Sequence, residues 1–585
     1  MHKNVIRNVL VMAAVLAASG AIATAQEHIP GKVEIAWDRY YTYPQIQSQL
    51  HAIAEAYPEI VTLQEIGQSL QGRPMVVAIV NNPETGADGT KPAMWIDGNV
   101  HGNEIQAGEV VMYSLWYLTK AFGHNDDLTQ LLNDFTFYFL PSQNPDGRQY
   151  WFDHPNTPHS SRSNQRPIDD DGDGLFDEDP PDDLDGDGHI TSMWMPDPNG
   201  RWIRDRDDPR IFKRVAADKK GEWTPLGSEG IDNDGDGRIN EDGPGGDDMN
   251  RNWPSDWKPT YVQFGAGPYP LSHPETSAIA AFIRSRPNIA SSQSYHNSGG
   301  MILRGPGASY LESSYPGADR RVYDELGRLG EKMLPYYRYM VIYKDLYTVH
   351  GGFVNWMAEG LGIISFTNEL WSTSKFFQRD VSSPDRELQW LWRDKIAFGQ
   401  LFTDYTEYDH PRYGKVLIGG PNKWSSRTTP TFMLEEECHR NFAFTMLQAG
   451  QMPKLSFGRQ HVQQIGDGLW SVTIQMDNEN LIPSRTQVQA KRGIGTNDIL
   501  FADGRQGASI VASGTLSRWI DMAMSPSPGQ EPGRVQVPDG IPGRGHRIFR
   551  FIVSGPEGGL IRLRYQAQRA RDVSTQIELR QDEGA

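Results

Sequence analysis

The sequence predicts an α/β fold, a sheet with helices on both faces, followed by a small C-terminal β-sandwich. Strand-like and helical segments alternate to residue 448, apart from a polar stretch rich in Asp and Gly at 148–250. Short alternating strand-like runs begin near residue 454. Strands that alternate with helices are typical of sheets covered on both faces. The chain has 585 residues, too many for one compact core, so we expect at least two domains.

The periodicity of apolar residues predicts the individual elements. In the first domain, helices are expected at 37–59, 105–122, 272–285, 317–333, 385–407 and 433–448. Strands are expected at 74–80, 92–100, 135–143, 288–296 and 362–368. The C-terminal domain has strand-like runs at 469–477, 486–492, 547–555 and 560–568, which favour an antiparallel sandwich of the immunoglobulin-like kind.

The N-terminal 26 residues have the pattern of a secretory signal peptide. Basic Lys3 and Arg7 precede an apolar run that closes with Ala23-Thr24-Ala25, a site for cleavage after Ala25. No later segment approaches the ~20 continuous apolar residues of a membrane span. We therefore expect a signal peptide at 1–25, a first domain at 26–452 and the sandwich at 453–585.

Charge and cysteine content narrow the class of protein. The formal net charge is −18, which argues against a nucleic-acid surface. The single cysteine, Cys438, cannot form an internal disulfide, and an exported protein without disulfides fits a bacterial periplasm or exterior. We expect a secreted or periplasmic protein in which Cys438 is a buried apolar residue.

A candidate metal site follows the strand predicted at 92–100. His101 and Glu104 are three positions apart on a short loop, so both side chains can face one point. Nitrogen and oxygen donors suit zinc, and a catalytic zinc site keeps one position open. Alone the pattern is weak, because a surface His–Glu pair has the same spacing.

Further motifs follow in a fixed order, and together they make the chain resemble the zinc carboxypeptidases of the carboxypeptidase A type. They are GNVHGNE (98–104), NPDG (144–147), DMNRNW (248–253), SYHNS (294–298), YTVHGGFVNW (347–356) and FTNEL (366–370). The resemblance covers roughly residues 35–450. It implies a mixed sheet, one catalytic zinc ion and a peptide or protein substrate with a free C-terminus. With the signal peptide and the acidic insertion, it indicates a secreted bacterial subgroup.

The resemblance also assigns roles to individual residues. It makes His101, Glu104 and His296 the zinc ligands, with Asp248 as a carboxylate that supports the first histidine from behind. Glu369 takes the position of the general base. The residues implied to bind substrate are Asn250 and Arg251 at its terminal carboxylate and Tyr347 above its C-terminal residue.

Two further assignments depend on looser matches. Laying RSNQRP on the family's W-R-K-N-R-R-P pattern puts Arg162 at the catalytic arginine, but Ser161 replaces the tryptophan, so Arg166 stays an alternative. Both arginines can instead be counter-ions to the acidic insertion. Val354 takes a position that lines the specificity pocket. Without an acid there, an apolar or aromatic C-terminal residue is favoured.

An acidic insertion separates two of the motifs, at 168–247. The pattern D-x-[DN]-x-D-G occurs three times in it, as Asp169-Asp171-Asp173, Asp183-Asp185-Asp187 and Asp232-Asp234-Asp236. Such alternating carboxylates wrap oxygen ligands around calcium in EF-hand loops. Position 12 lacks the usual Glu, but acids at positions 9–11 can substitute: Asp177, Glu178, Asp179, Glu241 and Asp242.

Residues 169–187 contain eleven acids and no base, so we expect bound calcium with a structural role, with simple hydration as the alternative. Because the insertion joins two site-bearing segments, we also expect it to rim the active-site cleft.

The sequence thus predicts a secreted zinc metallocarboxypeptidase, and two alternatives remain open. One is a metallo-amidase of the same fold that acts on cell-wall peptides or acylated amino acids. The other is a binding protein with an inactive peptidase fold. No motif in the C-terminal domain points to a chemistry, and the sequence does not determine an oligomeric state.

Overall fold

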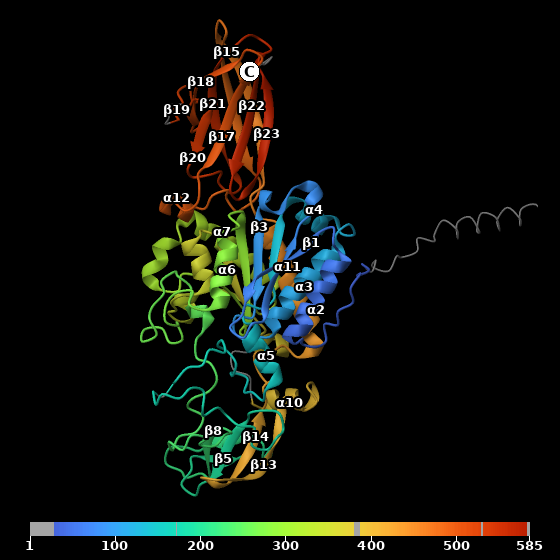
Figure 1. Ribbon diagram of the computed structural model, residues 1–585, viewed down its shortest axis with the longest axis vertical. Coiled ribbons are helices and arrows are strands. Elements are labelled where there is room, and N and C mark those ends of the chain that lie inside the picture. The colour runs from blue at the N-terminus through green and yellow to red at the C-terminus, as the bar shows by residue number, and fades with distance from the viewer. Residues whose placement is uncertain (1–28, 171, 380–385, 528–530, 582–585) are drawn as a thin grey trace, which may run out of the picture.

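The computed structural model describes residues 29–170, 172–379, 386–527 and 531–581, so the predicted signal peptide lies outside it. Three parts follow one another along the molecule (Figure 1). An α/β domain occupies the middle, a β-sandwich lies at one end and a six-stranded sheet lies at the other. Within these residues, no helix is long and apolar enough to cross a membrane.

The central domain is built on a mixed eight-stranded sheet, as predicted. Its strands lie in the order β1-β2-β4-β3-β9-β12-β10-β11. The four central strands β4, β3, β9 and β12 run parallel. Their bounds are β1 (Val61–Gln68), β2 (Pro74–Val80), β3 (Ala93–Gly98), β4 (Thr136–Leu140), β9 (Ile289–Asn297), β10 (Met301–Arg304), β11 (Arg338–Val341) and β12 (Ile364–Leu370).

Helices cover both faces of this sheet because its strands are apolar on both sides. Successive side chains of a strand point to opposite faces, so Met94 and Ile96 enter one core cluster and Trp95 the other. The first face is covered by α2 (Tyr43–Ala56), α3 (Gln106–Ala121), α4 (Asp126–Asp134), α7 (Gly317–Met333) and α11 (Leu434–Ala449). The second is covered by α6 (Pro274–Arg284), α8 (Phe353–Asn355) and the π-helical turn η6 (Trp356–Gly360).

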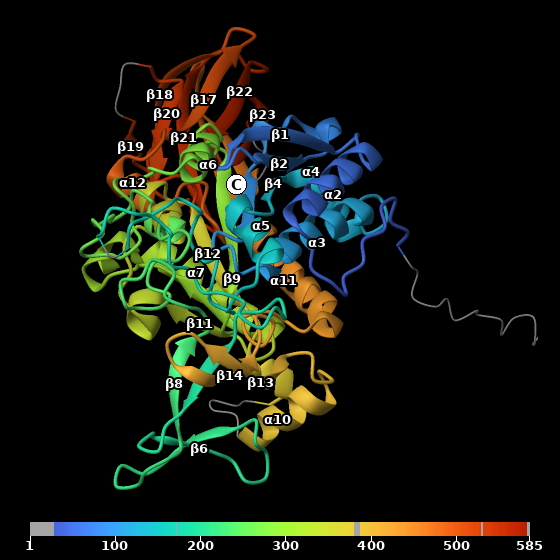
Figure 2. The same cartoon turned by 60° about the horizontal axis from the view of Figure 1, so that its bottom comes forward.

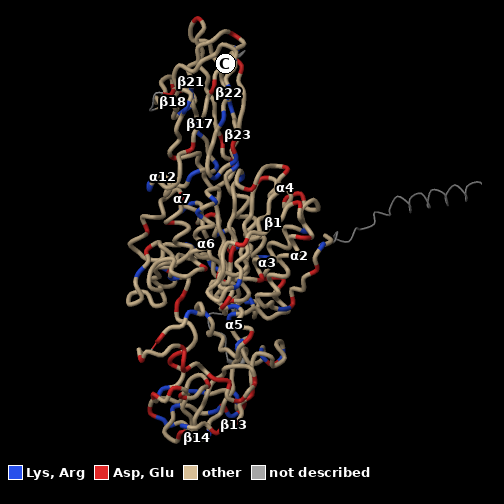
Figure 3. The backbone as a smooth tube through the Cα atoms, in the orientation of Figure 1, with Lys and Arg blue, Asp and Glu red and all other residues tan. Residues whose placement is uncertain are grey.

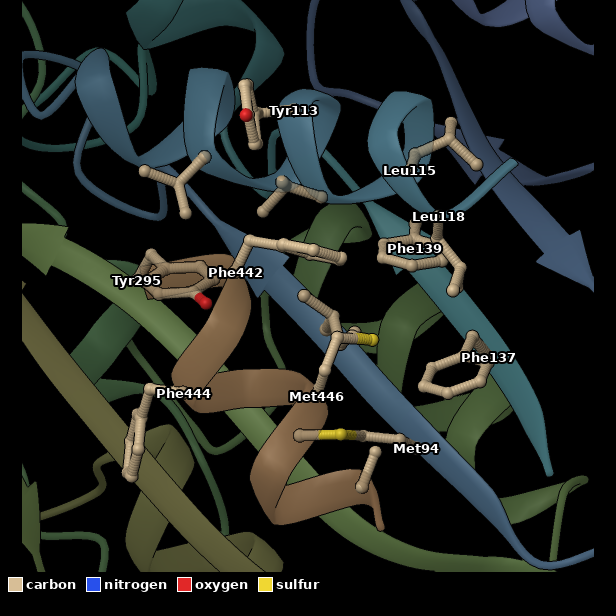
Figure 4. Close-up of a cluster of buried hydrophobic side chains, with 14 of the residues drawn as sticks. Met94, Tyr113, Leu115, Leu118, Phe137, Phe139, Tyr295, Phe442, Phe444 and Met446 are labelled. Carbon is tan, nitrogen blue, oxygen red and sulfur yellow. The ribbon is translucent and has the colours of Figure 1, made fainter. Parts of the chain in front are cut away.

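The first core cluster holds the sheet against α3 and α11 (Figure 4). Tyr113 and Leu115 of α3 and Phe442 and Met446 of α11 are buried over the strands. Cys438 is fully buried on α11, as expected for an apolar role.

The sheet at one end of the molecule combines two separate stretches of chain. Its strand order is β13-β14-β5-β8-β6-β7. Figure 2 shows this sheet below the α/β domain, beside α10 (Arg386–Lys395). The bounds are β5 (Ser192–Pro196), β6 (Trp202–Arg204), β7 (Phe212–Arg214), β8 (Trp223–Ser228), β13 (Phe402–His410) and β14 (Gly414–Pro421). We call it the inserted sheet.

One sequence prediction in this region is wrong. A single helix was expected at 385–407, but α10 spans only Arg386–Lys395, and β13 begins at Phe402. The run FTDYTEYDH is rich in Thr, Tyr and Phe, residue types that are enriched in strands, although its aromatic residues are three positions apart. Its hairpin partner β14 pairs with β5, more than 200 residues earlier in the chain, so no local signal marks this sheet.

The C-terminal domain consists of two antiparallel sheets around a common apolar core. Its strands are β15 (Leu455–Gly466), β16 (Leu469–Asn478), β17 (Asp498–Arg505), β18 (Ser509–Leu516), β19 (Ser525–Pro526), β20 (Arg534–Val537), β21 (Gly545–Ser554), β22 (Leu560–Ala567) and β23 (Ala570–Glu578). The strand-like run at 486–492 is wrong, because it forms α12 (Gln487–Arg492). Thr486 and Gln489 close a capping box, which starts a helix.

Candidate metal centre and active site

The candidate site lies where the parallel strands of the central sheet end. His101 and Glu104 follow β3, whereas His296 and Glu369 lie near the ends of β9 and β12. His296 and Glu369 are direct partners in the register of these two parallel strands. A cavity of about 530 Å³ opens over all four residues. Binding sites of α/β sheets characteristically occupy this edge.

The loop after β3 is shaped by close packing against neighbouring segments. Asn99 donates to the carbonyl groups of His101 and Gly102 and turns the chain at the end of the strand. A Cβ on Gly102 would lie 2.3 Å from the Ser161 carbonyl oxygen, so only glycine fits there. The backbone N–H of Gly102 donates to the Arg162 carbonyl at 3.1 Å. This contact fixes the loop to the segment that carries Arg162.

The side chains of His101, Glu104 and His296 converge on one point. His101 Nδ1 lies 2.9 Å from Glu104 Oε1 and 3.2 Å from His296 Nδ1. Glu104 Oε2 lies 3.0 Å from His296 Nδ1. All three residues are almost fully buried. Burial opposes ionisation of Glu104, but the two histidines overcome it and hold its pKa well below the ordinary value.

This donor set fits a zinc ion. Tetrahedral zinc with ligands at ~2.0–2.1 Å separates neighbouring ligand atoms by roughly 3.3 Å, close to the observed spacing. Two imidazole nitrogens and one carboxylate leave a coordination position open for a reacting molecule. His101, Glu104 and His296 are therefore the residues that would hold the ion.

Asp248 supports the metal site from behind. Its Oδ1 lies 3.1 Å from His101 Nε2, the ring nitrogen that points away from Glu104. A carboxylate at this nitrogen fixes the tautomer of a metal-binding histidine and strengthens it as a ligand. Burial would raise the pKa of Asp248, but Arg251, His101 and Arg162 together hold it well below its usual range.

The two candidate arginines, Arg162 and Arg166, differ in their position relative to the cavity. Arg162 lines the cavity and donates to Glu104 Oε1 at 3.0 Å and to Asp248 Oδ2 at 3.3 Å. Arg166 does not line the cavity and instead pairs with Asp247 at 3.1 Å. Arg162 is thus the arginine placed to meet a substrate beside the metal ligands, and Arg166 is a counter-ion in the base of the insertion.

Asn250 and Arg251 lie on a short 3₁₀ turn that Asp248 caps, because the Asp248 carboxylate accepts from the Asn250 backbone N–H at 2.8 Å. Asn250 Oδ1 accepts from the Phe353 backbone N–H at 2.9 Å, which ties this turn to the far wall of the cavity. The Arg251 side chain is only 10% exposed and lines the cavity, together with the largely exposed Tyr347.

The far wall of the cavity is apolar. Val354, predicted to line the specificity pocket, packs in a small core cluster, and Met301 and Leu346 extend the apolar lining. The other apolar residues of the wall are Leu303, Ile342 and Val349. Among the residues that the structure describes, Glu104 and Glu369 are the only acids in the lining. Both lie at the metal end, so the pocket wall itself carries no negative charge.

Glu369 lines the cavity on the His296 side of the metal ligands. Burial, together with the nearby Glu104 carboxylate, raises the pKa of Glu369 to about 7, against the opposing effects of His296, Arg162 and Arg427. A carboxyl group with a pKa near neutrality can both take up and release a proton at that pH.

Sequence reasoning missed Arg427, which also reaches the metal ligands. Its Nη1 donates to Glu104 Oε1 at 3.3 Å and to the Asn297 carbonyl at 3.1 Å. The adjoining Thr429 donates twice to the buried Gln106 side chain, which also accepts from Asn297. Arg427 therefore sits on an anchored loop, after β14 of the inserted sheet. No motif surrounds it, and only the structure reveals it.

The insertion places its three acidic loops outside the cavity. The carboxylates of Asp183 and Asp185 lie near Glu229, and those of Asp232, Asp234 and Asp236 lie near one another. Asp234 also lies close to two further groups, Asp173 with Glu178, and Asp179 with Glu241. Asp187 caps its own loop by accepting from the His189 backbone N–H, and Asp169 does the same for Gly172. Asp171 lies outside the described residues.

A family model described as zinc carboxypeptidase matches residues 46–186 and 219–397, which is more than half of the chain. The chain belongs to the zinc carboxypeptidase family. The matched residues of this zinc carboxypeptidase include all three candidate metal ligands, together with Arg162 and Glu369. A second model, described as a domain of unknown function, matches residues 454–578 of the sandwich.

Curated relatives resemble parts of this zinc carboxypeptidase. Carboxypeptidase E of Caenorhabditis elegans is 37% identical over 146 residues, which is 24% of this chain and 30% of that protein. Carboxypeptidase B of Astacus astacus is 34% identical over 116 residues, 20% of this chain and 36% of that protein. The matched region thus spans about a third of these relatives.

Among solved structures, carboxypeptidase A of Helicoverpa armigera is similar with a TM-score of 0.45 and 17% identity. That match covers 76% of this chain and 80% of the other.

Proposed function

We propose that this protein is a zinc-dependent metallocarboxypeptidase that removes the C-terminal residue from peptides or proteins and favours apolar or aromatic residues there. The observation that carries the proposal is a single cavity lined by three groups of residues. They are the candidate metal ligands with Glu369, the pair Asn250 and Arg251, and the apolar residues around Val354.

A zinc ion held by His101, Glu104 and His296 would supply Lewis acidity, which polarises a carbonyl group and makes a water molecule more acidic. Glu369 then has two tasks. It takes a proton from the attacking water and passes it to the leaving amine. Burial and the Glu104 carboxylate raise its pKa to about 7, and a bound cation would lower it, so the ionised form that accepts a proton is available near neutral pH.

Arg162 stabilises negative charge on the carbonyl oxygen. Its guanidinium lies within 3.0 Å of a ligand carboxylate, so a carbonyl bound at the metal site lies beside it. The side chain is one-third exposed and faces the cavity, and Asp248 holds it from the other side. A donor positioned before the reaction begins stabilises the transition state without reorganisation.

Arg251 and Asn250 restrict the reaction to chain ends. A planar guanidinium binds a carboxylate through two parallel hydrogen bonds, and an internal peptide bond offers no such anion. Tyr347, largely exposed at the rim, covers the C-terminal residue. The apolar wall around Val354 accepts that residue's side chain, because a basic side chain would find no acidic partner there.

The test uses metal-free protein reloaded with zinc and N-blocked dipeptides that end in Phe, Leu, Lys or Asp. We expect zinc-dependent release of Phe and Leu, and little turnover of the matching C-terminal amides. Arg251→Ala should raise KM for the free acids by ~10²-fold, the loss of a charged bidentate contact. Arg284→Ala, an exposed arginine on α6, is the matched control and should leave KM unchanged.

Other outcomes would replace the proposal. No zinc uptake would favour the inactive binding protein. Zinc uptake with cleavage of cell-wall peptides or acylated amino acids, but not of dipeptides, would favour the metallo-amidase.

Two further parts of the proposal concern location and a second metal. The N-terminal segment supports export to the periplasm or exterior, and fractionation of cells that express the whole chain tests this. The aspartates of the three acidic loops support structural calcium in the insertion. Full recovery of activity and stability on zinc alone, after chelation, would contradict that second metal.

A further inference from the structure

Two of the three acidic loops lie against each other. Asp179 and Asp242 form an antiparallel bridge, in which the Asp179 backbone N–H donates to the Asp242 carbonyl at 3.1 Å. The Asp179 carboxylate also accepts from the backbone N–H groups of Asn233 and Asn240, at 3.0 and 2.8 Å. The Asp242 carboxylate accepts from the Asp170 N–H at 3.4 Å. Each loop therefore caps the other.

The decisive feature of the pair is a set of buried carboxylate oxygens without donors. Both oxygens of Glu178, both of Glu241 and Oδ1 of Asp242 are shielded from solvent, and no residue that the structure describes donates to them. Asp242 is only 1% exposed. A buried carboxylate without a hydrogen-bond donor is strongly destabilising, so these oxygens require a cation or a proton.

The orphaned carboxyl groups face other carboxyl groups in a reciprocal arrangement. Glu178 of the first loop contacts Asp242 of the second, and Glu241 of the second contacts Asp179 of the first. Lost hydration and the facing carboxyl raise the pKa of Glu178 and of Glu241 to about 7 each. Carboxylate oxygens gathered in this way are the ligands that calcium prefers.

Among the residues that the structure describes, no Lys or Arg forms an ion pair with these four carboxyl groups. Arg238 and Arg412 approach only the outer carboxylates, at 3.8 Å from Asp236 and Asp232. Both side chains are exposed to solvent, which screens their charges.

The third loop differs from this pair. The buried Glu229 beside it accepts from the backbone N–H groups of Thr191 and Leu184, so its carboxylate is satisfied without an ion.

We infer that Glu178, Asp179, Glu241 and Asp242 form one paired site for two calcium ions, with Glu178 binding one ion and Glu241 the other. Asp242 and Asp179 complete the two halves across the bridge. Neither loop has the usual glutamate at position 12. Each loop instead contributes a carboxyl group to the ion of the other loop.

Residues 162–168 and 243–248 lie side by side between the paired site and the active-site cavity, and we call these two segments the stem. Between the loops and the cavity, Ser163 Oγ donates to the Gly245 carbonyl at 2.5 Å, and the Asn164 N–H donates to the Asp247 carbonyl at 3.1 Å. At the cavity end of the stem, one segment carries Arg162 and the other carries Asp248. Calcium at the closed end therefore positions both residues, a consequence that rests on the function proposed above.

The binding test uses full-length mature protein, stripped of metal and given one equivalent of zinc, into which calcium is titrated by calorimetry. We expect binding in the ~10⁻⁵–10⁻³ M range. In the double variant Glu178→Gln/Glu241→Gln, the number of bound ions should fall by two. Glu407→Gln, an exposed carboxyl on β13 of the same inserted sheet, is the matched control and should bind as the unmodified protein does.

Thermal unfolding distinguishes a variant that has lost its calcium ligands from one that is misfolded. Calcium should raise the midpoint of the unmodified protein and of Glu407→Gln by several degrees, but not that of the double variant. Without calcium, the double variant should be at least as stable as the unmodified protein, because it lacks the repelling carboxylates. No calcium-dependent shift in the unmodified protein, or an unchanged stoichiometry in the double variant, would overturn the site and favour carboxyl pairs that share a proton.

The positioning effect needs its own measurement. Withdrawing calcium at constant bound zinc should lower kcat/KM at least tenfold, whereas the double variant should be slow with or without calcium. Unchanged kcat/KM would overturn the positioning alone. If no substrate is turned over at all, the proposed function fails, but calorimetry and unfolding still decide the calcium site.

Discussion

The inserted sheet and the C-terminal sandwich are both additions to the central domain, yet they are connected to it in different ways. The chain segments that enter and leave the inserted sheet carry Arg162, Asp248 and Arg427, which all contact metal ligands or one another. The sandwich lies at the opposite end of the molecule (Figure 1). None of its described residues lines the cavity. An addition can thus be part of the active site or only fastened to the domain that holds it.

The contacts that fasten the sandwich to the central domain are mostly polar, and one buried apolar residue, Ile482, packs into the first core cluster of the central domain. Arg569 is 7% exposed and donates to the carbonyl groups of Leu361 and Gly362, just before β12. The Asp319 carboxylate accepts from the backbone N–H groups of Gln487 and Val488 and so caps α12. The sandwich has its own apolar core, separate from those of the central domain. We expect it to affect stability and not the reaction.

Charge also distinguishes the two additions. Acidic residues are frequent along the loops of the inserted region, in the lower part of Figure 3. The chain as a whole carries a net charge of −18, and residues 169–187 contribute eleven acids without a base. Self-repulsion of this kind is a reason for a region to need bound cations.

The largest effect should come from Arg162 at the end of the stem. Arg162→Ala should lower kcat/KM by ~10²–10³-fold, because it removes a positioned donor to the developing oxyanion. Arg166→Ala, in the same stem but paired with Asp247, should lower it only a few-fold. Equal losses in steady-state assays of the two variants would mean that the stem acts only through its fold.

Arg427 should have the next largest effect. Arg427→Ala should lower kcat/KM by ~10-fold, because one of two guanidinium groups beside Glu104 is lost while Arg162 remains. Arg427→Lys should recover part of the rate, since it keeps the charge but not the two-pronged geometry. Unchanged kinetics in both variants would mean that the hairpin β13–β14 does not contribute to the reaction.

The pH dependence of the reaction should not depend on the sandwich. Burial and the Glu104 carboxylate raise the pKa of Glu369 to about 7, and a bound metal cation would lower it. Because the ionised form accepts the proton, kcat/KM should rise with pH and level off by about pH 7. Glu369→Gln should abolish this rise, and variants of the sandwich should leave it in place. A profile that is flat at acidic pH in the unmodified enzyme would contradict the assignment.

The smallest effect on the reaction should come from the sandwich interface. Arg569→Ala removes two hydrogen bonds. The Leu361 carbonyl loses its Arg569 donor, whereas Thr486 Oγ1 still donates to the Gly362 carbonyl, so the change should cost ~1–3 kcal/mol in the free energy of unfolding. Zinc-dependent turnover should stay within twofold of the unmodified protein. Denaturant unfolding followed alongside kinetics checks both parts, and a large loss of kcat with little loss of stability would contradict this comparison.

The candidate site residues that the sequence predicts best are those that lie in short motifs. GNVHGNE, SYHNS and FTNEL each overlap the C-terminal end of a predicted strand, so the edge of a parallel sheet brings their side chains together. Sequence reasoning favoured Arg162 over Arg166 only on a loose motif match, because the choice depends on which side chain of the stem faces the cavity. It missed Arg427 and the inserted sheet, since both depend on the pairing of β14 with β5 across a long sequence separation.

The acidic loops show a similar limit. The alternating aspartates were visible in the sequence, and so were the acids at positions 9–11 of two loops. The sequence could not show that acids of one loop face the other loop, because this depends on the bridge between Asp179 and Asp242.

The pairing of β14 with β5 also sets the order in which the enzyme becomes complete during synthesis. The candidate metal ligands, Arg162 and Glu369 are all made before β13 and β14, so the central sheet can form while β5 has its neighbour β8 but still lacks β14. Chains are synthesised from the N-terminus, and early segments begin to fold first. Arg427 then arrives last at the rim of the cavity. A nascent chain thus gains its full set of cationic groups only after the edge of the inserted sheet has closed.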